Sequence, residues 1–336
     1  MSASPFPISP KQKIDFKKIE MEGWEFYSSN LPMFNTKELD QISDVITTQT
    51  LPDIVFGYNR LFFVNKKRNF LYEFSPIDSL SLSSFALQDI RLHPDSKEET
   101  KDVPMEEIKE EEHTSHSDID EITKLNRIDI KPERVEVKMA DKWKNRDTSG
   151  IEDYKEIEVI SDWTYSTPYK GTILYLDKNI ERIKDDFGLE IEMDEAPEHS
   201  DIKVERCEDE IPVDRLTPAN PIIHYMEVEL FEDELDDNGH TSSKVRFRIM
   251  KDWFYCLVRY YLRVDGVIVR ILDTRIFHDF DTNFIIREFW HKEATYDELR
   301  AKHFDLSSEW GLDPNQADRI FNSLTLKQKF KDMVTF

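Results

Sequence analysis

Three side chains near the end of one strand-like segment have the chemistry of a metal site. Asp273, His278 and Asp281 are close in sequence, and carboxylate and imidazole groups are common ligands of catalytic metals. No cysteine and no second histidine lies nearby to complete a ligand set. A strand-end histidine that hydrogen-bonds to protein explains His278 more simply. A metal-assisted hydrolase that uses these three residues is therefore our second hypothesis and not our first.

The motifs of the common enzyme classes are missing from the chain. No glycine-rich stretch precedes a Lys-Ser or Lys-Thr pair, so there is no phosphate loop, and the chain has only 8 glycines. The Gly-x-Ser-x-Gly turn of the serine hydrolases is also missing. We therefore predict a protein that is not an enzyme and that uses neither a metal nor an organic cofactor.

The acidic stretch "LFEDELDDNG" has the composition of a calcium-binding loop. Placing Gly239 at the sixth position of such a loop puts Glu234, Asp236 and Asn238 at ligand positions. The twelfth position, where a bidentate glutamate is needed, is then Val245. The missing glutamate argues against a calcium loop.

The residues on both sides of this stretch favour a β-hairpin instead. Apolar and charged residues alternate before it and after it, which is the pattern of strands with one buried face. Asn238 and Gly239 supply the positive φ angles of a tight turn. Pairing the two strands would set Glu227 and Glu229 against the basic residues of the second strand.

Two further segments combine aromatic and charged residues in a way that is typical of binding sites. "DWTYSTPYKGT" contains Trp163 and Tyr169, and "DGVIVRILDTR" places Asp273 and Arg275 on one strand face beside Ile271. Tryptophan, tyrosine and arginine dominate the energetics of protein interfaces. The alternative is a core strand whose polar end reaches solvent.

The charge distribution narrows the class of partner. The whole chain of 336 residues has a formal charge of −24, which argues against nucleic acid and against an anionic membrane surface. Residues 244–275, in contrast, hold eight basic and three acidic residues. This region suits a local anionic partner such as a carboxylate or an acidic peptide. The alternative is that each arginine simply lies on the solvent-facing side of a strand.

Two acidic stretches account for most of the negative charge. Residues 93–121 hold twelve acids and three lysines, and residues 185–210 hold twelve acids and two basic residues. Such segments bury too little apolar surface to offset the entropy of ordering. We expect a flexible N-terminus over residues 1–20 and one domain over 21–336, interrupted by a disordered insertion at 93–134 and an acidic loop at 185–220.

The remaining pattern predicts an α+β protein built on antiparallel, sandwich-like sheets, with helices near both ends. Asn35 and Glu38 mark a capped helix near the N-terminus, and helical spacing begins at Thr295 and again at Asp313, from where it runs to Val334. Between them, short strands are joined by turns such as the one at Asp265 and Gly266. The apolar run that precedes this turn fits either a helix or a strand. The chain begins without the apolar core of a signal peptide and has no run of 18 apolar residues. We expect a monomer in the cytoplasm, and in the nucleus as well.

Five blocks of the sequence resemble the TOR signalling pathway regulator-like (TIPRL) family. They are "LPDIVFGYNRL", "EFSPIDSL", "DWTYSTPYKGT", "EVELFEDELDDNG" and "YYLRVDGVIVRILDTRIFHD". The resemblance spans most of the chain outside the acidic stretches and the extreme N-terminus. The sequence departs from shorter members in its two acidic insertions, and it reads Ser-Thr-Pro where the family loop often has Thr-Thr-Asp.

The resemblance implies a non-catalytic protein that binds the catalytic subunits of type 2A-like protein phosphatases and restrains them. In fungi it implies a second partner, the TOR-pathway phosphatase adaptor. Matched by motif, Asp78, Ile222, Ile271 and Asp273 stand at positions tied to phosphatase binding. We therefore expect Asp273→Asn to fold normally and to bind a phosphatase more weakly. A general adaptor that acts through its acidic tracts is the third hypothesis.

The resemblance also gives the basic region a ligand. Type 2A catalytic subunits end in a short acidic and aromatic tail with a free carboxylate. Trp163 and Tyr169 are expected to pack on its aromatic residues. The arginines expected to pair with its acids are Arg259, Arg270, Arg275 and Arg287.

Overall fold

The computed structural model describes most of the chain outside the long acidic insertion. The described residues are 14–43, 46, 51–83, 132–133, 135, 137, 163–193, 201–216, 221–306 and 312–336. Most of the predicted insertion at 93–134 and most of the flexible N-terminus at 1–20 lie outside them. None of the helices in the described residues is long and apolar enough to span a membrane.

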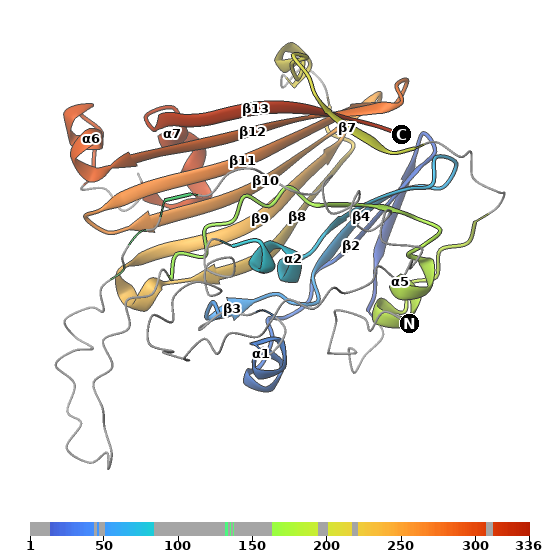
Figure 1. The fold of residues 1–336 in the computed structure, drawn as a ribbon, viewed down its shortest axis with the longest axis horizontal. Helices are drawn as coiled ribbons and strands as arrows, with labels where there is room; N and C mark the ends of the chain where they lie inside the picture. Colours follow the sequence, from blue (N-terminus) through green and yellow to red (C-terminus); the bar gives the residue numbers. More distant parts are fainter. Residues whose placement is uncertain are drawn as a thin grey trace, which may run out of the picture.

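The first half of the chain forms a five-stranded antiparallel sheet in the order β1-β2-β4-β5-β6 (Figure 1). It starts within the predicted flexible N-terminus, because β1 begins at Lys17 and Ile14 before it is buried. Its strands are β1 (Lys17–Met21), β2 (Trp24–Ser29), β4 (Arg60–Asn65), β5 (Phe70–Phe74) and β6 (Thr172–Tyr175). The helices beside it are α1 (Thr36–Ser43), α2 (Pro76–Ser81) and α5 (Ile180–Phe187). The predicted cap of α1 is confirmed, since the Asn35 and Glu38 side chains each accept a backbone N–H at the helix start.

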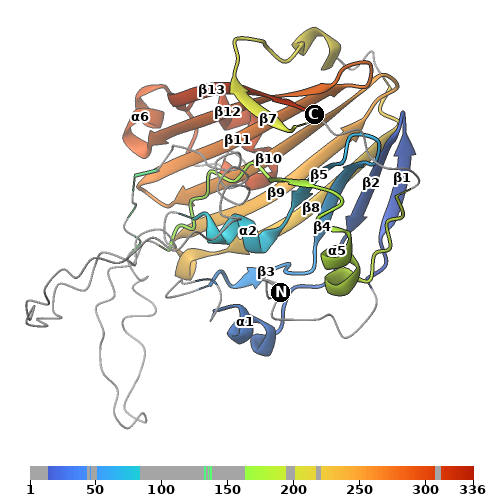
Figure 2. The ribbon, with the colours of Figure 1, turned by 45° about the vertical axis from the view of Figure 1, so that its right-hand side comes forward.

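The second half forms an eight-stranded antiparallel sheet in the order β3-β8-β9-β10-β11-β12-β13-β7 (Figure 2). Its long strands are β8 (His224–Asp233), β9 (Gly239–Ile249), β10 (Trp253–Val264), β11 (Ile268–Asp279), β12 (Phe284–Thr295) and β13 (Thr325–Thr335). The short strands β3 (Ile54–Val55) and β7 (Lys203–Arg206) end the sheet at its two edges. The predicted antiparallel sheets are confirmed.

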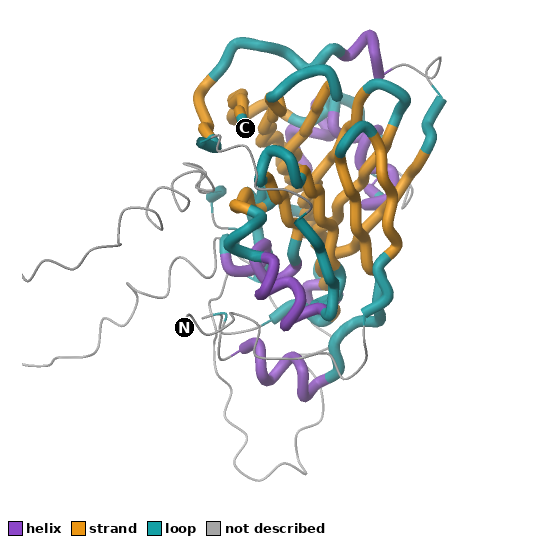
Figure 3. The backbone as a smooth tube through the Cα atoms, turned by 90° about the vertical axis from the view of Figure 1, so that its right-hand side faces the viewer, coloured by secondary structure: helices purple, strands orange, loops and turns teal. Residues whose placement is uncertain are grey.

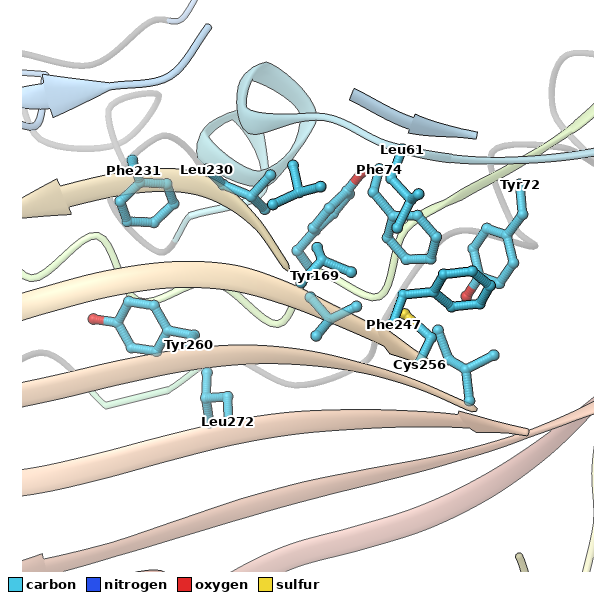
Figure 4. Close-up of a cluster of buried hydrophobic side chains, with 14 of the residues drawn as sticks. Leu61, Tyr72, Phe74, Tyr169, Leu230, Phe231, Phe247, Cys256, Tyr260 and Leu272 are labelled. Atoms are coloured by element: carbon cyan, nitrogen blue, oxygen red, sulfur yellow. The ribbon is translucent and has the colours of Figure 1, made fainter. Parts of the chain in front are cut away.

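The two sheets pack face to face around an aromatic core. Phe63 from the small sheet meets Phe247 and Phe254 from the large sheet, with ring centroids 4.4 and 5.2 Å apart. Figure 4 shows Tyr72 and Phe74 of the same core lying near Phe247 of the large sheet. Alternation along each strand sends every second residue into this core. The face of the large sheet that lines the core is called the inner face below, and the opposite face is called the outer face.

The predicted β8–β9 hairpin is confirmed, but its turn differs from the predicted one. Glu227 lies opposite Arg246, with Oε2 and Nε 3.0 Å apart. Five residues form the connection, and three of them (Leu235, Asp236 and Asp237) have positive φ. Gly239 does not. It is needed for a steric reason, because a Cβ atom there would lie 1.9 Å from the Arg263 carbonyl oxygen.

Residues 163–171, called the crossing segment, run across the inner face of the large sheet before entering β6 (light green in Figure 1). The hydroxyl of Thr241 on β9 donates to the Thr164 carbonyl over 3.1 Å. Further along, the Lys170 ammonium lies 3.4 Å from Asp332 on β13. The segment therefore spans the sheet from β9 to β13 and joins it to the small sheet.

The C-terminal region is only partly helical. Helix α6 (Tyr296–Ala301) starts after Thr295, as predicted, with a capping box formed by Thr295 and Glu298, and α7 (Ala317–Phe321) follows a turn capped by Asp313. The prediction that the helix continues past residue 325 is wrong, because that segment is the strand β13. Its pairing with β12 outweighs local helical spacing. Figure 3 shows the helices at the margins of the strands.

The predicted acidic loop at 185–220 also contains regular structure. Helix α5 continues to Phe187, β7 pairs with β13, and a short 3-10 helix, η1 (Val213–Leu216), follows. Ile211 is buried in a cluster with Trp253 and Phe277 on the outer face. A few apolar residues are thus enough to order parts of a strongly acidic stretch.

Candidate partner-binding surface

Asp273 is buried in a salt bridge within the large sheet. It lies directly opposite Arg259 across β10 and β11, with no solvent exposure. The Arg259 Nε and Nη2 atoms donate to its two carboxylate oxygens, each over 2.7 Å. Asp318 accepts a third hydrogen bond from Arg259 over 2.6 Å. This geometry explains why a charge is tolerated in an apolar strand, and it leaves Asp273 without a surface to offer a partner.

Two other arginines proposed to contact an acidic tail are buried as well. Arg270 donates to Glu293 over 2.9 Å and to the Ser166 hydroxyl on the crossing segment over 2.9 Å. Arg287 binds both oxygens of Asp332 over 2.6 and 2.8 Å. Both point to the inner face, where they fill the space between the sheets. Desolvated ion pairs of this kind hold a structure together, and their cations are not free for a ligand.

Arg275 differs from the other three predicted arginines because its guanidinium meets aromatic rings but forms no salt bridge within the described residues. It lies half-buried on the outer face, 5.1 Å from the centre of the Trp290 ring and 5.2 Å from that of Phe321. Lys329 lies 4.0 Å from the Trp290 ring, and Lys292 lies 4.2 Å from the Phe321 ring. We call these five residues the cationic patch.

The three cations of the patch, Arg275, Lys292 and Lys329, form no salt bridge within the part of the chain that the structure describes. Lys292 donates to the Phe321 carbonyl over 3.1 Å. Burial, together with the charge of Arg275, lowers the pKa of Lys292. The patch therefore offers positive charge around an indole ring, which suits an anionic ligand that also carries an aromatic group.

Four elements position the patch, and α7 contributes Phe321. Arg275 is on β11, Trp290 and Lys292 are on β12, and Lys329 is on β13, where it lies directly opposite Trp290. The Trp290 ring is oriented by its Nε1–H, which donates to Glu288 over 3.2 Å. Sequence reasoning found only Arg275. Lys329 joins the patch only if its segment is a strand, and the sequence pattern favours a helix there.

The predicted tail-binding aromatics lie on the crossing segment instead. Tyr169 is buried, and its hydroxyl accepts from the Ser75 N–H over 2.9 Å. Trp163 is partly buried against the main core, and its Nε1–H is buried without a hydrogen-bond partner. Both residues join the two sheets. Their burial explains why this segment is so rich in aromatic and polar residues.

Asp78 lies in a different layer of the molecule. It is half-buried in the first turn of α2 and accepts a hydrogen bond from Thr172 on β6 over 3.1 Å. Burial and the neighbouring Glu73 carboxylate raise the pKa of Asp78 to about 6, against the opposing charge of Arg60. Glu73 in turn binds Arg182 from α5 over 2.5 Å, on the far side of the small sheet.

The other two predicted positions have opposite environments. Ile271 is fully buried on the outer face under α6 and α7, whereas 49% of Ile222 is exposed just before β8. Ile271, Asp273 and Arg275 thus share one face, as predicted, and the remaining predicted residues lie elsewhere. A role in phosphatase binding for the seven residues stays a prediction.

The hydrolase hypothesis fails on geometry. The side chain of Asp273 is on the outer face, while His278 is on the inner face among Trp24, Phe254 and Phe336. The Nδ1 atom of His278 is 2.8 Å from the Phe284 carbonyl oxygen, and burial lowers its pKa to about 4. Within the described residues, no group of three acidic, histidine or cysteine side chains could hold a metal ion.

Comparison with known proteins identifies a family. Residues 105–300 match the model of the TIP41-like family. A TIP41-like protein of Dictyostelium discoideum is 25% identical over 87% of this chain and 85% of its own length. The type 2A phosphatase activator TIP41 of Saccharomyces cerevisiae is 29% identical over 89% of this chain and 69% of its own length. A human TIP41-like protein is 34% identical, and that match covers 49% of this chain and 52% of the human protein.

Proposed function

Because the chain belongs to the TIP41-like family, we propose that it is a non-catalytic regulator of type 2A-like protein phosphatases. It binds their catalytic subunit and restrains it, within TOR nutrient signalling. The family match and the printed name of the yeast relative, a type 2A phosphatase activator, support the choice of partner. The TOR-pathway phosphatase adaptor is a second proposed partner. We propose that the chain acts as a monomer in the cytoplasm and nucleus.

The cationic patch is the observation that supports a defined contact. Three cations that form no salt bridge with any described carboxylate surround the Trp290 ring on the outer face. A segment with acidic and aromatic side chains and a free carboxylate matches both features. Arg275 supplies a guanidinium that binds carboxylates in two-pronged fashion. Trp290 supplies an edge or face for an aromatic ring. Of the four arginines proposed from sequence, Arg275 is the one that we retain for this contact.

The test measures the affinity of the chain for a purified type 2A catalytic subunit by calorimetry. Arg275→Glu should weaken binding at least about tenfold, a loss of about 1.4 kcal/mol. Trp290→Ala should weaken it to a similar extent. Lys251→Glu is the matched control, because it makes the same charge change at an exposed residue outside the patch. Wild-type affinity in both patch variants would exclude the patch.

A catalytic subunit that lacks its acidic tail separates the tail contact from the rest of the interface. It should bind more weakly than the intact subunit, and Arg275→Glu should cause no further loss. If Arg275→Glu weakened binding to the tail-less subunit as much as binding to the intact subunit, the patch would contact another part of the subunit. Phosphatase activity measured in the same titrations gives the direction of regulation. A rise in activity on binding would overturn restraint and leave the binding proposal standing.

A further inference from the structure

Among the described residues, strand β8 is paired along its length on one side only. On that side it forms the hairpin with β9. On its other side it pairs with the two-residue strand β3, opposite Phe231 and Glu232 near its C-terminal end. The N-terminal half of β8 is therefore an edge of the large sheet. Edges with unpaired main-chain groups accept strands from other chains unless they are blocked.

The middle of this edge is blocked by two side-chain amides. Asn59 Nδ2 donates to the Glu229 carbonyl over 2.8 Å, and Asn30 Nδ2 donates to the Glu227 carbonyl over 3.1 Å. Both carbonyls therefore point away from β9. Because main-chain groups alternate in direction along a strand, the N–H and C=O of Tyr225 point the same way. No protein group among the described residues blocks the edge at Tyr225.

Exposed apolar side chains gather at this unblocked end. Ile222, Ile223 and Tyr225 expose 49%, 43% and 48% of their surface. A cluster of large exposed apolar residues on a soluble protein usually marks a surface that binds a partner. Next to Tyr225, directly across the hairpin, the guanidinium of Arg248 is exposed and has no carboxylate partner among the described residues.

We propose that residues 222–226 receive an extended segment of the phosphatase catalytic subunit, which adds to the large sheet as a further strand along β8. Main-chain hydrogen bonds at Tyr225 would supply the pairing, and apolar side chains of the segment would cover Ile222 and Ile223. An acidic residue of the segment would pair with Arg248. Asn30 and Asn59 limit the added strand to a few residues. This proposal rests on the proposed function, but it names a surface separate from the cationic patch.

The decisive experiment compares Tyr225→Pro with Tyr225→Ala. Both variants remove the aromatic side chain, and only proline removes the N–H. Proline is tolerated at such a position, because the N–H of an edge residue that faces solvent takes no part in the β8–β9 ladder. We expect Tyr225→Pro to bind the catalytic subunit at least tenfold more weakly than Tyr225→Ala. Equal affinity of the two folded variants would overturn the added strand.

Hydrogen exchange on the wild-type chain gives a second readout that needs no variant. The Tyr225 amide should exchange quickly in the free chain and at least tenfold more slowly in the complex. Unchanged exchange at Tyr225 in a formed complex would refute the proposal. Failure of the wild-type chain to bind any catalytic subunit would instead refute the proposed function. If Arg275→Glu weakened binding while Tyr225→Pro and Tyr225→Ala had equal affinities, the proposed function would stand and the added strand would be excluded.

Discussion

The inner and outer faces of the large sheet both carry cations on β11 and β12, and their surroundings differ completely. On the inner face, Arg270 and Arg287 are buried and bound to carboxylates and to the crossing segment. On the outer face, Arg275 and Lys292 meet aromatic rings and no carboxylate among the described residues. The same residue types therefore serve two purposes. A buried cation with its partner fixes the structure, and a cation without one is available to a ligand.

Arg259 and Asp273 modify this comparison. They are on the outer face, yet they form a buried pair, because α7 packs over them. Asp318 on this helix accepts a hydrogen bond from Arg259, and Ile320 two residues later is buried in the outer-face cluster. The role of a charged residue therefore depends on whether another element packs over it, and not only on which face of the sheet it lies. The outer face is covered by α6 and α7 at one end, and η1 packs at the other through Leu216. Arg275 lies between these covers.

The largest effect is expected from a variant that breaks the ion pair between Arg287 and Asp332 on the inner face. Arg287→Ala should lower the free energy of unfolding by about 3–5 kcal/mol, because Asp332 is left buried with only the more distant Lys170. Arg275→Ala on the outer face should change it by no more than about 0.5 kcal/mol. Denaturant unfolding of both variants measures the difference. Equal losses would show that the two faces do not divide the roles as described.

Asp273→Asn is expected to lower the free energy of unfolding by somewhat less, about 3 kcal/mol, because Arg259 keeps its hydrogen bond to Asp318. This reverses the expectation from sequence that the variant folds normally. The matched control is Asp318→Asn, whose side chain is 72% exposed and should contribute about 0–1 kcal/mol. Unfolding and phosphatase affinity should be measured together. A variant with wild-type stability and weakened binding would restore Asp273 as a contact residue.

The smallest expected effect is a dependence on pH that comes from Lys170. Burial, with the charge of Arg287, lowers the pKa of Lys170 to about 7, against the attraction of Asp332. The unfolded chain keeps the ordinary lysine pKa of about 10.4, so it binds this proton more tightly than the folded chain. Stability therefore rises with pH above 7, by on the order of 2 kcal/mol between pH 7 and 9. Lys170→Gln should remove this rise, and an unchanged slope in that variant would assign it to other groups.

The predicted hairpins show how far local patterns reach. Alternating residues correctly placed β8 and β9, and the Asp265–Gly266 turn is confirmed with Gly266 at a φ of +74°. These features depend on neighbours in sequence, so they are readable without the fold. The apolar run before this turn leaves helix and strand open, and the structure makes it the strand β10. Residues 325–335 show the limit. Their helical spacing is real, but pairing with β12 places them in the sheet and brings Lys329 to Trp290.

The sequence by itself determined the antiparallel sheets, the capped helices and the family, because each depends on local pattern or on ordered motifs. It also placed Asp273 and Arg275 on one strand face. Only the tertiary structure decided that Asp273 is locked to Arg259 while Arg275 is not. The physical reason is that burial and pairing depend on residues brought in from distant segments. Asp318 reaches Arg259 from 59 positions away, and no pattern within one strand encodes that contact.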